Sequence, residues 1–303
     1  MFKFEKTQKI VQIGSTRIGG QLGENPTALI GSIFYERHKI VSDAKQGLFD
    51  SKAAEVLLET QERVAEKSGN PAIIDIVGST AKALIRYFDF VSARSDRPFL
   101  VDGPAPDVRL DAIKHCREIG LLDRAIYNSI DENVKPEEIT ALRDLDVKSA
   151  VVLAFNSRDP RVEGRIRILN DQRGQQLLAA AASAGIENVI VDTAVLDAPS
   201  IGTSARTVYV VKKEFGLPAG CAPSNAIYSW KELGKLWSHA FDAGIATSHA
   251  FPIASGADFI LYGPIKYAEY VFPACAMVDA FIAYDSRWRG IRPHRQHPLY
   301  KIF

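Results

Sequence analysis

The chain has 303 residues, 47% of them hydrophobic, and its 37 Lys and Arg nearly balance its 36 Asp and Glu, leaving a formal charge of +1. This balance argues against a dedicated nucleic-acid or membrane-surface binder, which would usually carry a strong basic excess. Three distant cysteines without a CxxC motif favour a reducing compartment and exclude a cysteine-based zinc finger. The charged start MFKFEKTQKI, together with the lack of any apolar run of about 18 residues, predicts a soluble, cytoplasmic protein with no membrane span.

Residues 2–25 alternate weakly around Gly14 and Ser15, a pattern that predicts a β-hairpin ahead of the main domain. Eight strand-like apolar runs follow, and helical patterns separate them. The runs are ALIGSIF from residue 28, AIIDIVG from 72, PFLVDG from 98, RAIYNSI from 124, SAVVLAF from 149, NVIVDTA from 188, AGCAPSNA from 219 and ADFILYG from 257. This alternation of eight strand-like runs with helical patterns predicts a (β/α)8 TIM barrel formed by residues 1–303 as a single domain. A doubly wound sheet is the alternative, but it would not normally use eight similarly spaced units.

Polar residues stand where the strands of such a barrel would carry its active site, at their carboxyl ends. They are Asp102 in VDG, Asn128 in YNS, Asp192 in VDT and Asn225 in PSN, while Asp75 lies inside the second run, IIDIVG. Asp and Asn at strand ends also commonly cap the next helix or fix a turn, so each one alone has a structural alternative. Asp75 is the hardest to explain that way, because a carboxylate within a strand is costly unless it is paired or faces a wet cavity.

A ring of carboxylates and amides accepts hydrogen bonds, and it suits a flat heterocycle with several N–H donors and a carbonyl, such as a reduced pterin. No GxGxxG, GxxxxGK[ST], GxSxG or HExxH motif occurs, which removes the commonest signals for dinucleotides, nucleoside triphosphates, serine hydrolases and zinc proteases. Apart from the close pair His294 and His297, the histidines show no metal-binding spacing, and we expect no metal site. Trp230 and Trp237 are expected to pack in the helix after the seventh strand.

The stretches GENPTALIGSIFY, GNPAIIDIVG, ENVIVDTAVLDAPSIG and VFPACAMVDAFIAY resemble the H-subunit family of tetrahydromethanopterin S-methyltransferase over nearly the whole chain. The Asp, Asn, Asp, Asn order also looks like the pterin-binding barrels of methyltetrahydrofolate–corrinoid methyltransferases. The resemblance implies that Asp102, Asn128 and Asp192 hold the pterin ring. It further implies that Asn225 lies beside the nitrogen that carries the methyl group, and that Asp75 is the in-strand carboxylate of those barrels, which makes these two the expected catalytic residues.

The same resemblance implies a reaction and its partners. A methyl group would move between a cobalamin-type corrinoid, carried by a separate corrinoid protein and cycling between methyl-Co(III) and Co(I), and nitrogen 5 of tetrahydrofolate, forming methyltetrahydrofolate. This would place the chain, as a homodimer, in a bacterial demethylation system, for instance for glycine betaine. Tetrahydromethanopterin is the alternative pterin. The seventh run, GCAPSNA, reads APSN where GPAN is expected of the archaeal relatives, so Ser224 joins the expected pterin site and can reflect a different pterin.

Two alternative functions remain, and one basic loop has two interpretations. Dihydropteroate synthase is another pterin barrel, but its SxRPG-like stretch is missing from a strand end, since SDRPF at 95–99 precedes the third strand. A non-catalytic scaffold protein that only binds a partner complex is a rival from a different class. The loop SRDPRVEGRIR at 157–167 holds four arginines, which would either meet the acidic tail of a folate or form a solvated face.

Overall fold

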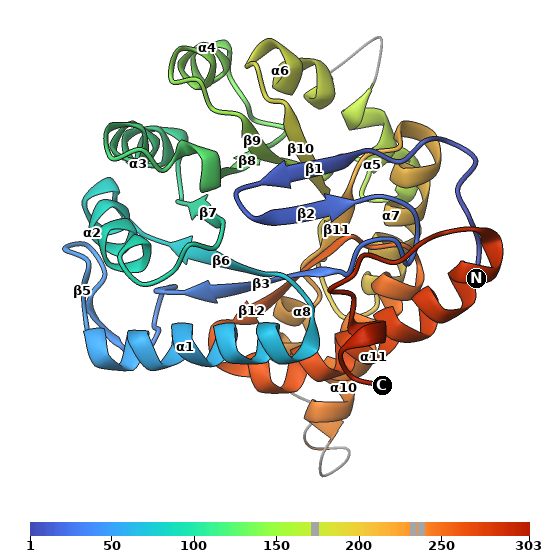
Figure 1. The fold of residues 1–303 in the computed structure, drawn as a ribbon. Coiled ribbons are helices and arrows are strands. Elements are labelled where there is room, and N and C mark those ends of the chain that lie inside the picture. Colours follow the sequence, from blue (N-terminus) through green and yellow to red (C-terminus); the bar gives the residue numbers. More distant parts are fainter. Residues whose placement is uncertain (171–175, 231–234, 236–239) are drawn as a thin grey trace.

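The computed structural model describes residues 1–170, 176–230, 235 and 240–303, and its ribbon is drawn in Figure 1. Eight parallel strands form a closed barrel in which the last strand pairs with the first. In chain order they are β3 (Ala28–Ile33), β6 (Ala72–Val77), β7 (Phe99–Asp102), β8 (Ala125–Ile130), β9 (Ser149–Leu153), β10 (Asn188–Asp192), β11 (Ala219–Cys221) and β12 (Phe259–Pro264). The predicted TIM barrel is therefore confirmed, and each predicted run contains one strand.

Helices surround the strands as an outer layer (Figure 1). They are α1 (Ser51–Ser68), α2 (Ala81–Ser92), α3 (Pro106–Glu118), α4 (Pro136–Asp144), α5 (Val162–Leu169), α6 (Leu177–Ser183), α7 (Ile201–Phe215), α8 (Ser224–Ser229), α10 (Ala240–Ala254) and α11 (Ala268–Ser286). Short 3-10 turns span Leu122–Arg124, Ile265–Tyr267, Arg287–Arg289 and Pro298–Tyr300. None of the helices in the described part of the chain is both long enough and apolar enough to cross a membrane.

Local sequence signals set several helix ends. The Asp50 side chain caps α1 by accepting a hydrogen bond from the Ala53 amide at 3.0 Å, and Gly69 ends the helix in the left-handed conformation that glycine tolerates best. Thr80 caps α2 in the same way through the Ala83 amide, at 3.1 Å. A proline occupies the first residue of both α3 and α4, where its missing N–H leaves no hydrogen bond unmade.

The barrel interior is a small apolar core of its own. Alternate residues of the strands point inward, and the inner cluster includes Ile30, Ile73, Leu100, Ile126 and Ile190. The predicted N-terminal hairpin, β1 (Ile10–Ile13) paired with β2 (Thr16–Gly19), is confirmed, and its Val11, Ile13 and Ile18 belong to this inner cluster. The hairpin therefore packs its apolar face against the barrel interior. A second hairpin, β4 (Val41–Asp43) with β5 (Leu48–Phe49), was not predicted from the sequence.

Candidate pterin site at the carboxyl ends of the strands

The barrel's inward-facing polar residues form one layer. Asp75, Asp102, Asn128 and Asp192 each come two residues after an inner apolar residue of the same strand, namely Ile73, Leu100, Ile126 and Ile190 respectively. Because side chains alternate along a strand, each polar residue points to the same inner side as that apolar residue, one step closer to the carboxyl end. The structure thus brings four of the expected site residues onto one face, above the apolar interior.

Asp75 is almost fully buried, with 3% of its surface exposed. Ser32, its register partner on β3, donates a hydrogen bond from Oγ to Asp75 Oδ2 at 2.6 Å. The other oxygen, Oδ1, is buried and has no hydrogen-bond partner among the described residues. Burial raises the pKa of Asp75, and the hydrogen bond from Ser32 only partly opposes this effect. A buried acceptor left without a donor is rare in folded proteins and calls for an explanation.

Asp102 and Asn128 are register partners on β7 and β8, and the Asn128 side chain acts to lower the pKa of Asp102. Burial raises the pKa of Asp102 well above its ordinary value, and the neighbouring charge of Asp75 raises it further. The guanidinium of Arg109 opposes the rise. Burial and the neighbouring carboxylate therefore both favour the protonated form of Asp102.

Arg109 was missed by the sequence reasoning. It comes from α3, is 7% exposed, and donates from Nη1 to the carbonyl oxygen of Gly103 at 2.9 Å. It also approaches Glu138, which accepts a hydrogen bond from the Tyr127 hydroxyl at 2.6 Å. The signal was present, since Arg109 stands at helical spacing with the buried Ala112 and Cys116, where an apolar residue would be ordinary.

Asp192 is 8% exposed at the end of β10. Burial raises its pKa to about 6, while the Ala194 amide, which donates to Oδ1 at 2.8 Å, and the charge of Arg165 partly oppose the shift. Arg165 is 1% exposed and donates to the carbonyl oxygens of Pro160, at 2.7 Å, and Ala194, at 2.8 Å. Of the four arginines expected to meet a folate tail or solvent, Arg165 therefore does neither, because it is buried beneath the loop after β10.

The seventh strand is shorter than predicted. β11 ends at Cys221, and α8 begins at Ser224, so Asn225 lies in the first turn of a helix instead of at a strand end. Pro223 explains the early end, because it has no N–H to donate to a strand ladder and readily precedes a helix. Ser224 is fully buried and its hydroxyl donates to the Leu261 carbonyl oxygen at 3.3 Å. The side chain of Asn225 and all of Trp237 lie outside what the structure describes.

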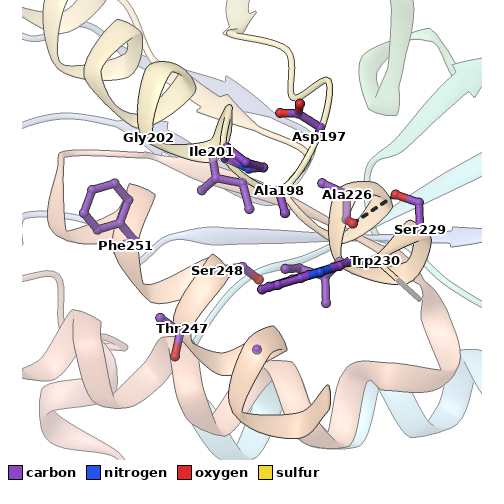
Figure 2. A pocket seen from close by; sticks show the side chains of 13 residues that line it. Asp197, Ala198, Ile201, Gly202, Ala226, Ser229, Trp230, Thr247, Ser248 and Phe251 are labelled. Atoms are coloured by element: carbon purple, nitrogen blue, oxygen red, sulfur yellow. Dashed lines mark hydrogen bonds between the residues drawn. The ribbon is translucent and has the colours of Figure 1, made fainter. Parts of the chain in front are cut away.

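A cavity of about 700 Å³ lies beside the barrel mouth, between the start of α7, α8 and α10. Figure 2 shows Trp230 and Ala226 of the α8 segment facing Ile201 of α7 and Ser248 of α10, with Phe251 at the far side. Asp197 is the one charged residue among the described residues that line it. None of the four polar residues of the inner layer lines this cavity. Trp230 lines it with 42% of its surface exposed, instead of being packed as expected.

Comparison with known proteins adds independent findings. Residues 6–294 match the family described as "Tetrahydromethanopterin S-methyltransferase MtrH subunit". The chain is 38% identical over 309 residues to the H subunit of tetrahydromethanopterin S-methyltransferase from Methanothermobacter thermautotrophicus, covering 100% of both chains. It is 42% identical over 309 residues to the H subunit of the putative methyltransferase mtx from Methanosarcina barkeri, covering 99% of both.

Solved structures with the same fold include dihydropteroate synthases. That of Yersinia pestis superposes with a TM-score of 0.59 at 15% identity, over 90% of this chain and 98% of the other. That of Xanthomonas albilineans superposes with a TM-score of 0.57 at 17% identity, over 93% and 98%. At such low identity, these matches establish the shared barrel fold and nothing about the reaction.

Proposed function

The chain belongs to the H-subunit family of tetrahydromethanopterin S-methyltransferase, and from this premise we propose that it moves a methyl group to or from nitrogen 5 of a reduced pterin. The pterin would lie at the carboxyl ends of the strands, over the layer formed by Asp75, Asp102, Asn128 and Asp192. The observation that carries the proposal is the buried, unpartnered Oδ1 of Asp75. A pterin ring presents several N–H donors, and one of them would supply the hydrogen bond that this oxygen lacks.

Different residues of the inner layer would bind different groups of the pterin. Asp102 and Asn128 are register partners, so one carboxylate and one amide lie together on adjacent strands. Such a pair would accept two N–H groups of the pterin and also offer an N–H to its carbonyl. Asp192 supplies a further carboxylate from β10, which only β9 separates from β8, and the Ala194 amide holds it by a hydrogen bond. These side chains are placed by strands, which suits precise alignment of a rigid ring.

Proton control is the second task of the site. When methylpterin gives up its methyl group, nitrogen 5 leaves with an electron pair and must gain a proton; in the reverse direction it loses one. Burial raises the pKa of Asp75 and Asp102, so each carboxyl group would take up a proton more readily than an exposed one. We assign the proton transfer to Asp75, directly or through water, and the contact with nitrogen 5 to Asn225, as the family resemblance implies.

A corrinoid held by a separate protein would supply or accept the methyl group. The family membership and the names of the relatives favour tetrahydromethanopterin as the pterin over tetrahydrofolate, which the sequence led us to expect. Ser224 is the only residue we single out in favour of tetrahydrofolate, because it stands where the archaeal relatives are expected to have a different residue. Its hydroxyl is already bonded to Leu261, so it gives tetrahydrofolate little support.

A spectroscopic methyl-transfer assay tests the proposal. The purified protein is mixed with methylcobalamin or cob(I)alamin, or with a cognate corrinoid protein, and with either tetrahydromethanopterin or tetrahydrofolate. We expect turnover with at least one pterin, and faster turnover with tetrahydromethanopterin. Absence of turnover with both pterins, while calorimetry still detects pterin binding, would favour the scaffold alternative. Absence of both turnover and binding would contradict the proposed site itself.

A further inference from the structure

The cavity of about 700 Å³ beside the barrel mouth has the size and the walls of a small-molecule site. Such sites usually have a volume of about 300–1,000 Å³ and are lined mostly by hydrophobic and aromatic side chains. Here Ile201, Ala226 and Trp230 lie around the cavity, and Phe251 stands at its far side (Figure 2). Trp230 is 42% exposed and Phe251 is 52% exposed, so each ring leaves apolar surface that the described residues do not cover. A ligand with a flat apolar part would cover it.

Polar side chains of the lining bond to the chain itself. The Ser229 hydroxyl donates to the Ala226 carbonyl oxygen at 3.0 Å, as Figure 2 shows. The Ser248 hydroxyl donates to the Ile245 carbonyl oxygen, also at 3.0 Å. Both hydroxyl hydrogens are therefore in use, and neither is left to donate to a ligand. The cavity accordingly suits an aromatic ring better than a group that needs several hydrogen bonds.

The cavity adjoins the expected pterin residues along the chain at two places. Ala226 and Ile227, which line it, directly follow Asn225 in α8, and residues 197–199, which also line it, belong to the loop that begins after Asp192. In a reduced pterin, carbon 6 is bonded to nitrogen 5 and carries the arm that joins the ring to an aryl amine. If Asn225 contacts nitrogen 5, this arm leaves the ring beside α8. The wall of the cavity is formed by the same helix.

We propose that this cavity binds the aryl arm of the pterin, with the arm's ring against the indole of Trp230, while the pterin ring itself lies over the inner layer of carboxyl and amide groups. This inference rests on the proposed function and adds a second subsite to it. An aryl ring and an indole attract each other in offset-stacked or edge-to-face contact, and both lose apolar surface to water. Trp230 is then a binding residue for the arm and takes no part in the transfer of the methyl group.

Asp197 bears on which arm fits. Its Oδ1 accepts a hydrogen bond from the Ser200 amide at 2.9 Å, and the Ser200 hydroxyl oxygen accepts one from the Leu196 amide at 2.9 Å, so the loop at the edge of the cavity is held by its own contacts. In tetrahydrofolate the aryl ring carries an anionic glutamate through an amide bond, whereas in tetrahydromethanopterin it carries an uncharged chain of hydroxyl groups. A carboxylate close behind the ring would be repelled by Asp197. The cavity therefore favours the arm of tetrahydromethanopterin.

Calorimetry of the full-length protein with three pterins tests the arm site. Two of them, tetrahydromethanopterin and tetrahydrofolate, carry an aryl arm, and 6-methyltetrahydropterin carries none. Gly202→Leu is the blocking variant, because Gly202 lines the cavity and a carbon added to it meets no atom within 4 Å. We expect it to weaken binding of both armed pterins at least about 10-fold, and that of 6-methyltetrahydropterin less than about 2-fold. Gly202→Ala is the matched control, since it changes the same helical glycine but adds only one methyl group.

Two further variants test individual residues. Trp230→Ala should weaken binding of the armed pterins at least about 5-fold and leave 6-methyltetrahydropterin nearly unaffected. Trp288→Ala, which removes an indole that is 81% exposed and does not line the cavity, is its control and should change no affinity. Asp197→Asn keeps the oxygen that accepts from Ser200 but loses the charge. It should raise the affinity for tetrahydrofolate several-fold and change that for tetrahydromethanopterin less than about 2-fold.

The outcomes separate this inference from the proposed function. Equal weakening of armed and armless pterins by Gly202→Leu, or armed-pterin affinities that neither Gly202→Leu nor Trp230→Ala changes, would overturn the arm site and leave the pterin site standing. A wild type that binds none of the three pterins would contradict both. An unchanged ratio of the two armed affinities in Asp197→Asn would overturn the assigned role of its charge. Circular dichroism checks that each variant is folded, and Trp230→Ala decides the matter if Gly202→Leu is not.

Discussion

Buried carboxyl groups occupy both ends of the barrel, and the number of hydrogen-bond donors around them differs between the two ends. At the amino-terminal end, Asp279 accepts hydrogen bonds from the Thr27 amide at 3.0 Å, the Thr27 hydroxyl at 2.8 Å and the Asn70 side chain at 2.6 Å. Asp258 lies beside Lys212 and accepts from the Ala219 amide at 3.0 Å. At the carboxyl end, Asp75 has one donor, and its second oxygen has none among the described residues.

Burial alone does not separate the two groups. It raises the pKa of Asp279 to about 6, and it also raises the pKa of Asp75. The difference lies in the number of donors that the fold itself supplies. A carboxyl group with a full set of partners fixes one part of the fold to another, whereas one with an incomplete set costs stability and is retained for binding or catalysis. The comparison therefore separates Asp279, whose donors the fold supplies, from Asp75, which we propose as a pterin ligand.

The largest expected effect concerns Asp279. The Asp279→Ala variant removes the acceptor of three buried hydrogen bonds, and each such loss costs about 1–3 kcal/mol. We expect the free energy of unfolding to fall by about 3 kcal/mol or more, measured by urea denaturation. The pterin dissociation constant of the folded variant should change less than about 2-fold. A variant with normal stability and weakened pterin binding would break the distinction between the two ends.

Neutralising Asp192 should stabilise the fold at neutral pH, whereas truncating Asp279 destabilises it. Its folded-state pKa of about 6 is higher than in the unfolded chain, so the folded state binds this proton more tightly. The resulting stability is fully present below about pH 4 and is lost as the pH rises through about 6. Asp192→Asn removes this loss. Relative to the wild type, the variant should therefore gain on the order of 2 kcal/mol between pH 4 and pH 8.

Denaturation of both proteins across that pH range measures this gain. A gain that does not depend on pH would contradict the pKa assignment. Asp279→Asn is not a substitute control, because its amide would also disturb a filled set of hydrogen bonds.

A smaller effect distinguishes binding from turnover within the site. We expect Asn225→Ala to lower the turnover number at least about 10-fold while changing the pterin dissociation constant less than about 3-fold, because its proposed contact is with the reacting nitrogen. Asp192→Ala should mainly weaken binding. Single-turnover kinetics and calorimetry measure the two quantities separately. Equal losses of binding in both variants would refute these role assignments.

Much of this site was predictable because strand alternation is a strong signal. Four polar side chains are expected to point to the barrel interior, because each stands two positions after an inward-facing apolar residue of its strand. The structure places all four on that side: Asp75, Asp102, Asn128 and Asp192. Their roles in pterin binding remain a prediction. The order of the eight strands also followed from their regular spacing.

Contacts between distant segments could not be predicted in the same way. Nothing in the sequence singles out Ser32, and only the register of β3 against β6 brings it to Asp75. Arg165 stood in a basic loop that suggested solvent, yet it bonds to backbone atoms about 30 residues away along the chain. The end of β11 was misplaced because small apolar residues such as Ala222 and Pro223 suit both a strand end and the approach to a helix.

The central claim is that the unpartnered oxygen of Asp75 accepts a hydrogen bond from the pterin, and one comparison tests it most directly. Calorimetry of wild type and Asp75→Asn with tetrahydromethanopterin, and then with tetrahydrofolate, measures affinity, and urea denaturation of the same samples measures stability. We expect the variant to bind at least about 30-fold more weakly, since an amide N–H would face a pterin N–H, and to be as stable as the wild type or more so. Unchanged pterin affinity in the variant, or weaker binding that accompanies a loss of stability, would contradict the account.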